Sequence, residues 1–145
     1  MTFTRQTSPH GSLVALSTMK DEGPFVVEWV AHHLAIGFTS VMVYTNDCSD
    51  GTDSLLKKLQ AMDIGVHHRE NVIPEGMKPH PSMLKLAAEE ESVVNSDWLL
   101  VLDADEFIRA DPELFRSSLM ASDAPILLPW VTFVPTSADD PTERN

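Results

Sequence analysis

Residues 98–108, WLLVLDADEFI, decide how the rest of the sequence is interpreted. Five apolar residues run directly into three carboxylates, those of Asp103, Asp105 and Glu106. A short and continuously apolar run is typical of a strand that is buried on both faces of a parallel sheet. Three acidic side chains at the end of such a strand need a reason, because close carboxylates repel one another and raise the pKa of one of them.

A bound cation is one reason for this arrangement. Two aspartates spaced i and i+2 at a strand-to-loop junction can both reach one hard cation, if the backbone leaves regular strand geometry there. Mg²⁺ and Mn²⁺ prefer oxygen ligands and keep positions open for substrate phosphates. The sequence therefore predicts Asp103 and Asp105 as metal ligands. The competing interpretation is that one aspartate caps the following turn, which accounts for one aspartate but not for the group.

The composition of the 145-residue chain limits the kinds of partner it can have. Acidic residues outnumber basic ones by 22 to 10, and the net charge is -12. This balance argues against nucleic acid or an anionic membrane surface as main partner, since both attract clusters of Lys and Arg. A phosphorylated ligand is compatible with this charge if a metal ion lies between it and the carboxylates.

The sequence carries no signal for export or for membrane insertion. Its single cysteine, Cys48, cannot form an intramolecular disulfide. Residues 1–11 are polar and lack the apolar segment of a signal peptide. No apolar run approaches the ~20 residues that cross a bilayer. These features predict a cytoplasmic protein without a transmembrane segment.

Apolar runs and helical spacing alternate along the chain, separated by turn-forming residues. The predicted strands are 12–18, 40–44, 65–69, 98–102 and 125–128. The predicted helices are 25–36, 52–62, 81–94 and 112–120, the last with Asp111 as its N-cap. This order predicts an α/β fold with a mostly parallel sheet and helices on both faces. One domain is expected at 12–135, between a polar leader at 1–11 and a polar tail at 136–145.

Three polar clusters follow predicted strands, namely 18–22 (TMKDE), 45–47 (TND) and 103–106 (DADE). In an open parallel sheet, ligands bind beyond the carboxyl ends of the strands. The clusters are far apart in sequence, but this topology would bring them to one edge and form a site. For the second cluster a turn is an equally good interpretation, with Thr52 as the N-cap of the next helix.

The remaining polar residues give weaker signals. His32 and His33 lie on a predicted buried helix without HExxH spacing, so we interpret them as packed or surface groups rather than metal ligands. The run 89–91, three glutamates, is expected to be solvated. Cys48 has no activating base beside it, which argues against a role as nucleophile.

Three stretches stand in a fixed order along the chain: KDEGPFVVEWVAHHLAIGF, VYTNDCSDGT and DWLLVLDADEFI. Together they resemble the family-2-like glycosyltransferases with a GT-A fold. The resemblance is to the branch that carries K-[ND]-E, E-W-x-x-[HY]-H, N-D-x-S-D-G-T and D-x-D-E-F in this order. It covers about 13–108, and three ordered motifs make it specific, whereas DADE alone would not.

The resemblance implies a donor site and a reaction. In that family the DxD aspartates hold a divalent cation that bridges the diphosphate of a nucleotide sugar, which implies Mn²⁺ or Mg²⁺ at Asp103 and Asp105. The reaction is transfer of a sugar from this donor to an acceptor hydroxyl. The ends of the first two strands line the nucleoside pocket. The donor-binding residues implied are Thr18, Lys20, Glu22, Asn46, Asp47, Asp103 and Asp105.

The sequence departs from the family pattern in two places. Thr45 and Asn46 stand where the commoner pattern has an aspartate pair, so that contact to the nucleoside is not carried over. The chain also stops soon after Trp130, whereas members of the family continue with an acceptor-binding half that supplies the base of inverting enzymes. We therefore expect a short or truncated relative with its catalytic base unassigned. Glu106 is the nearest carboxylate that is not already predicted as a metal ligand. It is a candidate for the catalytic base for that reason alone.

Two other functions stay open at the level of the sequence. A degenerate, non-catalytic GT-A half would bind nucleotide or a partner chain, and an apolar edge at 126–134 would predict self-association. A phosphatase of the haloacid-dehalogenase type also ends an apolar strand in DxD. That pattern lies near the N-terminus and has Thr or Val shortly after the second aspartate, where Glu106 and Phe107 stand here. The sequence names neither the sugar, the nucleotide, the acceptor nor the oligomeric state.

Overall fold

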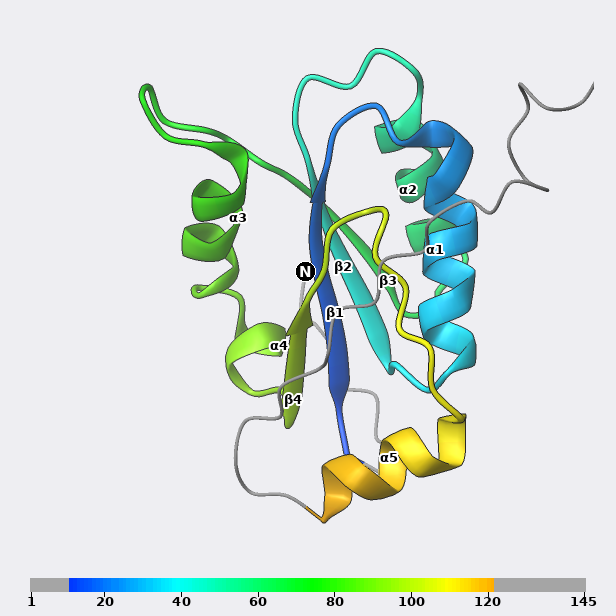
Figure 1. The fold of residues 1–145 in the computed structure, drawn as a ribbon. Helices are drawn as coiled ribbons and strands as arrows, with labels where there is room; N and C mark the ends of the chain where they lie inside the picture. Colours follow the sequence, from blue (N-terminus) through cyan, green and yellow to red (C-terminus); the bar gives the residue numbers. More distant parts are fainter. Residues whose placement is uncertain (1–10, 122–145) are drawn as a thin grey trace, which may run out of the picture.

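A computed structural model describes residues 11–121 of the chain. Within this range, strands and helices alternate in the order that the hydrophobic pattern predicts (Figure 1). The strands are β1 (Leu13–Met19), β2 (Ser40–Thr45), β3 (Val66–Glu70) and β4 (Trp98–Val101). The helices are α1 (Gly23–Ala35), α2 (Thr52–Ala61), α3 (Pro79–Ala87), α4 (Glu91–Val94) and α5 (Pro112–Met120).

The sheet is parallel throughout, with the strand order β3-β2-β1-β4. The central strand β1 pairs with β2, where Val14 lies opposite Ser40, and with β4, where Leu13 lies opposite Trp98. Because all strands run the same way, their carboxyl ends share one edge, which points toward the top of Figure 1. The order of the strands reverses between β1 and β4. Ligands of open α/β sheets bind at such a switch point.

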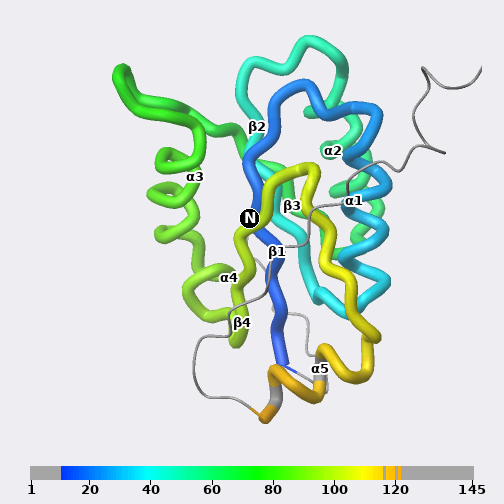
Figure 2. The backbone as a smooth tube through the Cα atoms, in the orientation of Figure 1, coloured from blue at the N-terminus to red at the C-terminus, as the bar shows by residue number. Residues whose placement is uncertain are grey.

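Helices cover both faces of this sheet, as predicted. α1 and α2 lie on one face, and α3 and α4 lie on the other (Figures 1 and 2). Along β1, Leu13 and Ala15 join the core under α1 and α2, whereas Val14 and Leu16 join the core under α3 and α4. A central strand with helices on both sides has no solvated face, which is why its sequence is apolar at consecutive positions.

The ends of α1 follow the predicted signals. Pro24 lies in the first turn, where its missing N–H costs nothing. At the other end, the N–H of Phe38 donates to the His33 carbonyl at 3.0 Å, and the N–H of Gly37 donates to the Leu34 carbonyl at 3.2 Å. Gly37 has a φ of 116°. This is a Schellman motif, in which a glycine ends the helix with a positive φ.

The two predicted N-caps have different outcomes. Asp111 caps α5, and its carboxylate accepts two main-chain N–H groups at 3.0 and 3.1 Å. The prediction for Thr52 is wrong, because Thr52 is the first helical residue of α2 and Gly51 occupies the cap position with a φ of 89°. The side chain that serves the start of this helix is Asp50, which accepts the N–H of Thr52 at 3.0 Å.

The predicted helix 81–94 is wrong in its middle. The chain forms two helices, α3 up to Ala87 and α4 from Glu91, and Glu90 between them is extended, with φ -79° and ψ 119°. This conformation places the Glu90 carboxylate 2.7 Å from Nε of Arg69 on β3. Glu90 is therefore paired and half-buried rather than solvated, and its ion pair accompanies the interruption between the two helices.

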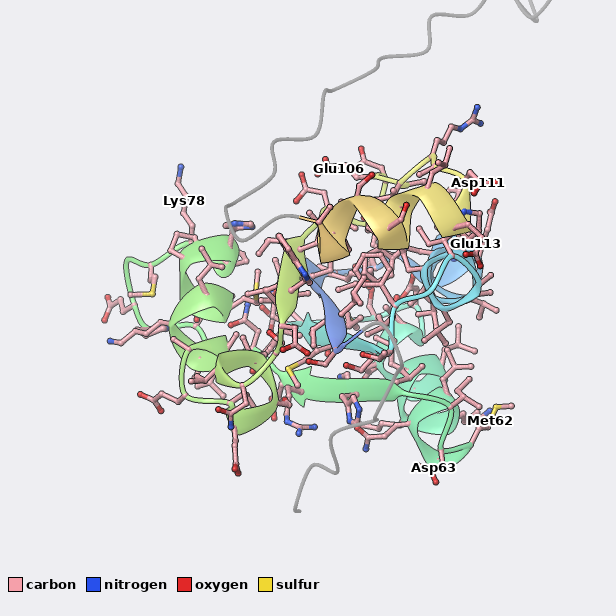
Figure 3. All side chains as sticks on the ribbon, turned by 90° about the horizontal axis from the view of Figure 1, so that it is seen from below. Met62, Asp63, Lys78, Glu106, Asp111 and Glu113 are labelled. Carbon is pink, nitrogen blue, oxygen red and sulfur yellow. The ribbon has the colours of Figure 1, made fainter. Side chains whose placement is uncertain are left out.

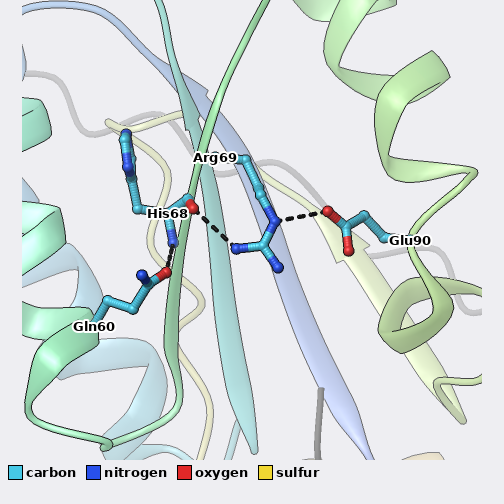
Figure 4. A network of polar contacts seen from close by, with 4 residues as sticks. All are labelled: Gln60, His68, Arg69 and Glu90. Atoms are coloured by element: carbon cyan, nitrogen blue, oxygen red, sulfur yellow. Dashed lines mark hydrogen bonds and ion pairs between the residues drawn. The ribbon is translucent and has the colours of Figure 1, made fainter. Parts of the chain in front are cut away.

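The same arginine belongs to a network on the edge strand β3 (Figure 4). The N–H of His68 donates to Oε1 of Gln60 at 2.8 Å. The carbonyl of His68 accepts Nη1 of Arg69 at 3.0 Å. Side chains from α2 and from β3 itself thus satisfy both main-chain groups of one residue on this strand.

Some expectations fall on parts of the chain that the structure does not describe. The predicted strand 125–128, the apolar stretch 126–134 and the tail 136–145 lie outside the described residues, as do 1–10 of the leader. The domain limits at 12 and 135 therefore stay predictions. In residues 11–121, no helix combines the length and the apolar character needed to cross a membrane.

Candidate functional site

The carboxylates of Asp103, Asp105 and Glu106 converge just beyond β4, in a segment that we call the acidic turn (103–106). One oxygen from each side chain lies within 4.8 Å of an oxygen of each of the others. Asp103 and Asp105 are exposed, while Ala104 between them is buried in the core under α1. This alternation fixes the main chain of the turn on the core and directs the acidic groups outward.

The acidic turn is closed by its own hydrogen bonds. The N–H of Glu106 donates to the Asp103 carbonyl at 3.1 Å, and the N–H of Asp103 donates to Oε1 of Glu106 at 3.0 Å. Partial burial raises the pKa of Asp103, and so do a hydrogen bond with Glu106 and repulsion from Glu106 and Asp105, while His80 of α3 opposes the shift. Within residues 11–121, neither aspartate carboxylate caps a main-chain N–H. Three oxygen donors so close together suit a hard divalent cation, whose charge offsets their repulsion.

Trp29 of α1 holds the two ends of this turn. Its indole N–H is shared between the carbonyl of Asp103 at 3.2 Å and the carbonyl of Glu106 at 2.9 Å. The Trp29 side chain is fully buried. A buried N–H without a partner costs free energy, so this shared hydrogen bond also satisfies the indole.

Two histidines on the same face of α1 hold Ile108, the second residue after the turn. Nε2 of His32 lies 2.6 Å from the carbonyl of Ile108, and the N–H of Ile108 donates to Nε2 of His33 at 3.5 Å. Nδ1 of His33 lies 2.8 Å from the carbonyl of Trp29. Because a carbonyl only accepts, the proton of His33 is on Nδ1 and its Nε2 can accept. Burial lowers the pKa of His33 to about 4, so this ring is neutral near pH 7.

The sequence predicted both histidines as packed or surface groups, and it did not indicate their contacts with Ile108, two residues after the acidic turn. The signal that could have found it is the spacing of Trp29, His32 and His33, because positions i, i+3 and i+4 share one face of a helix. Their partners could not be named from this spacing.

Two aspartates join the loops that follow β1 and β2, and we call this arrangement the loop clasp. Oδ1 of Asp21 accepts the N–H groups of Ser49 at 2.7 Å and of Asp50 at 3.3 Å. In return, Oδ2 of Asp50 accepts the N–H of Gly23 at 2.9 Å, and its Oδ1 accepts the N–H of Thr52. The Thr52 hydroxyl, followed by the Gly23 N–H, lowers the pKa of Asp50.

The loop clasp accounts for part of the two motifs at these loops. A Cβ added to Gly23 would lie 2.9 Å from Oδ2 of Asp50, so the Asp50 carboxylate would have to shift if residue 23 carried a side chain. Asp21 has a φ of 52°, a left-handed conformation that aspartate adopts more readily than most residues. These two aspartates have a structural role, which agrees with the turn interpretation of residues 45–52.

The structure places the residues implied in nucleoside binding at the same sheet edge. Lys20 and Asn46 directly follow Met19 and Thr45, which lie opposite each other in the β1–β2 pair. Lys20 is exposed and Asn46 is half-buried. The others are found on the same loops: Thr18 on β1, Glu22 at the start of α1, and Asp47, exposed with a φ of 49°.

Asn71, just after β3, is a further residue at this edge, and no pattern in the sequence indicated it. It is buried, and its Nδ2 donates to Oγ1 of Thr18 at 3.2 Å and to the carbonyl of Pro79 at 3.0 Å. Its Oδ1 is buried without a hydrogen-bond partner in the described part of the chain. Asn71 therefore fixes the Thr18 hydroxyl, which is one of the residues implied in donor binding.

No protein-family model matches the chain, and no curated protein matches its sequence. Among solved structures, the chain resembles the mannosyltransferase PcManGT from Pyrobaculum calidifontis in complex with GDP-Man and Mn²⁺, with a TM-score of 0.59 at 15% sequence identity. The match covers 78% of this chain and 33% of PcManGT, so the chain spans about a third of that protein's length. The chain has a glycosyltransferase-like fold. This likeness confirms the predicted α/β fold, and membership of family 2 stays a prediction.

Proposed function

We propose that the protein binds a nucleotide sugar through Mn²⁺ or Mg²⁺ at Asp103 and Asp105, and that it transfers the sugar to an acceptor hydroxyl. The observation that carries the proposal is the convergence of three carboxylates within 4.8 Å at the carboxyl edge of a glycosyltransferase-like fold. The turn follows β4, beside the point where the strand order reverses. PcManGT was solved with GDP-Man and Mn²⁺, which makes GDP-Man the first donor to test.

The charges of the chain support a cation between protein and donor. A diphosphate would be repelled by the acidic turn and by a net charge of -12. A bound cation offsets the negative charge that develops on a leaving diphosphate. The proposed ligands are Asp103 and Asp105, with the Glu106 carboxylate within reach of the same ion. The residues proposed to face the nucleoside are Thr18, Lys20, Glu22, Asn46 and Asp47.

A nucleotide-binding module without transfer is the second candidate function. The observation that favours it concerns Glu106, the nearest spare carboxylate. Its Oε1 accepts the N–H of Asp103 and so serves the main chain of the acidic turn. A catalytic base must instead reach the proton of the acceptor hydroxyl. The base therefore stays unassigned within residues 11–121, and donor binding is tested before transfer.

Calorimetric titration with GDP, GDP-Man and UDP, with and without Mn²⁺, tests donor binding. We expect binding in the wild type only when Mn²⁺ is present, and its loss in Asp105→Asn. Asp63→Asn is the matched control, because Asp63 is an exposed aspartate on the other side of the molecule from Glu106 (Figure 3). Equal binding without metal, or equal binding by Asp105→Asn, would contradict the proposal.

Product analysis then separates the candidate functions. Consumption of GDP-Man or another nucleotide sugar with Mn²⁺ and an acceptor mixture supports transfer. Metal-dependent binding without consumption supports the binding module. Release of phosphate from a generic aryl phosphate would instead favour the phosphatase that the DxD pattern left open.

A further inference from the structure

We propose that Trp29, His32 and His33 are positioning residues for the cation site. This inference rests on the proposed function, because it concerns the geometry of the same carboxylates. The three side chains bind main-chain groups of residues 103–108 and do not occupy the carboxylates of Asp103 and Asp105. They act through the acidic turn and are not themselves ligands.

Trp29 sets the width of the acidic turn. One indole N–H is shared by the carbonyls of Asp103 and Glu106, so the two ends of the turn are tied to one atom. Three carboxylates within 4.8 Å repel one another and favour a wider turn in the absence of a cation. The indole is fully buried and cannot exchange its partners for water. Together with the hydrogen bonds inside the turn, Trp29 therefore holds the main chain that carries the three carboxylates.

His32 and His33 fix the exit of the turn. Both main-chain groups of Ile108 are engaged, the carbonyl by Nε2 of His32 and the N–H by Nε2 of His33. The carbonyl of Trp29 fixes the proton of His33 on Nδ1, which leaves Nε2 as an acceptor. The helix therefore sets the tautomer that the turn needs.

Ring packing holds these side chains in place. The rings of Trp29 and His33 are 4.6 Å apart, and Phe107 stacks on His33 at 5.9 Å and meets His32 edge-on at 5.2 Å. Phe107 belongs to the segment that α1 supports, so α1 and this segment are joined by ring packing as well as by hydrogen bonds. The partners of Trp29 in the turn are 74 and 77 residues away in the sequence. Two distant stretches thus form one unit at the site.

The decisive variant is Trp29→Phe, which removes the N–H and keeps an aromatic ring in the core. Its matched control is Trp98→Phe, the same chemical change at a half-buried tryptophan of β4 outside these contacts. Residues that orient metal ligands are typically worth about 10- to 100-fold in metal affinity. We expect Mn²⁺ affinity, measured by electron paramagnetic resonance, to fall about tenfold in Trp29→Phe and less than about twofold in Trp98→Phe.

A pair of variants at His32 tests the hydrogen bond itself. His32→Leu removes the donor to the Ile108 carbonyl, whereas His32→Gln restores an N–H donor on a side chain of similar reach. We expect His32→Leu to weaken Mn²⁺ binding and His32→Gln to recover most of it. In the metal-free protein, the amides of Glu106 and Ile108 should exchange faster in His32→Leu and in Trp29→Phe than in the wild type, with α3 unchanged.

The inference is overturned if the Trp29→Phe and His32→Leu proteins unfold at lower urea concentrations but bind Mn²⁺ with the affinity of the wild type. Their role would then be packing alone. Failure of the proposed function looks different, because it appears in the wild type. A wild type that binds no Mn²⁺, or an Asp105→Asn protein that binds it equally well, overturns both proposals without any change in α1.

Discussion

Two acidic groups lie at the carboxyl edge of the sheet, and they are built in opposite ways. In the loop clasp, the carboxylates of Asp21 and Asp50 accept main-chain N–H groups and hold two loops together. In the acidic turn, side chains of α1 hold the main chain, and the carboxylates of Asp103 and Asp105 are exposed. The carboxylates of the loop clasp are hydrogen-bonded to the main chain, whereas those of Asp103 and Asp105 are exposed to solvent.

This difference supports our choice of Asp103 and Asp105 as the proposed ligands. Hydrogen bonds to the charged form lower the pKa of Asp50, and burial with neighbouring carboxylates raises the pKa of Asp103. A carboxylate that already accepts N–H groups gains little from a cation, whereas one beside other carboxylates gains much. How the main chain is supported therefore separates the structural aspartates of the loop clasp from the aspartates that we propose as metal ligands at the same edge.

The largest expected effect concerns the support from α1. Trp29→Ala should lower the free energy of unfolding by about 3–5 kcal/mol, because it empties a fully buried site and removes the donor to the acidic turn. Phe25→Ala on the same helix is the control, since Phe25 is 55% exposed, and should cost less than about 1 kcal/mol. Urea unfolding of both proteins measures the difference. Equal losses would mean that α1 does not support the turn from within the core.

Acid should loosen the contact of His33 with Ile108 before it opens the loop clasp. The pKa of His33 is lowered from 6.5 to about 4, so the unfolded chain binds its proton at a higher pH than the folded protein does. Stability from neutral His33 is complete above pH 6.5 and is lost as the pH falls toward 4, a loss of roughly 2–3 kcal/mol. The pKa of Asp50 is also lowered, from 3.8, so its contribution is lost only below that pH.

The measurement is amide exchange of Ile108 and Ser49 as the pH is lowered. Local signals are needed because the pKa values of His67 and His68 are lowered as well, and both affect unfolding of the whole protein. We expect the Ile108 amide to lose protection between pH 6.5 and 4 while the Ser49 amide keeps it. In His33→Gln this selective loss should disappear. Loss of both amides at the same pH would remove the distinction between the two groups.

The loop clasp can be tested by a double-mutant cycle. Gly23→Ala places a Cβ 2.9 Å from Oδ2 of Asp50 and should destabilise the wild type by roughly 1 kcal/mol. In the Asp50→Ala protein the same change should be neutral or stabilising, because alanine is a better helix residue than glycine. Thermal unfolding of the four proteins gives the coupling. Additive effects would mean that Gly23 and Asp50 are not coupled. A change in Mn²⁺ affinity of more than about twofold would mean that the loop clasp is not independent of the acidic turn.

The smallest effect is expected away from both groups, at the ion pair of Arg69 and Glu90. Both side chains are about a quarter exposed, so Glu90→Gln should cost less than about 1 kcal/mol and should leave Mn²⁺ affinity unchanged. Unfolding at low and high salt measures this contribution, which should shrink as salt is added. A larger loss would mean that the junction between α3 and α4 depends on this pair.

The fold could be predicted because burial leaves a local pattern in the sequence. β1 is buried and apolar at consecutive positions, and glycine and proline mark the ends of α1. β4 is equally apolar, but the prediction that it is buried on both faces is wrong for the described residues, because β4 is an edge strand of the described sheet and Leu99 is 42% exposed. The interruption between α3 and α4 could not be predicted, because it accompanies a bond from Glu90 to a residue 21 positions away. Local patterns describe an element, but not the distant partner that interrupts it.

The candidate site could be predicted from the sequence only in part, for the same reason. Asp103 and Asp105 were proposed from an apolar strand that ends in carboxylates, and their role as metal ligands stays a prediction. The sequence could not show that Asp50 is hydrogen-bonded within the loops, since both groups are simply aspartates in turns. Nor could it pair Trp29 with the acidic turn, because a bond from a side chain to a distant main-chain carbonyl leaves no periodicity.

The network around His68 limits how this sheet can grow. The exposed backbone of an edge strand is a template for strand addition from another molecule. On β3 this template is interrupted, because Gln60 takes the N–H of His68 and Arg69 takes its carbonyl. An incoming strand would have to break both bonds at the middle of a five-residue strand. Addition of a strand from another molecule to β3 should therefore be unfavourable.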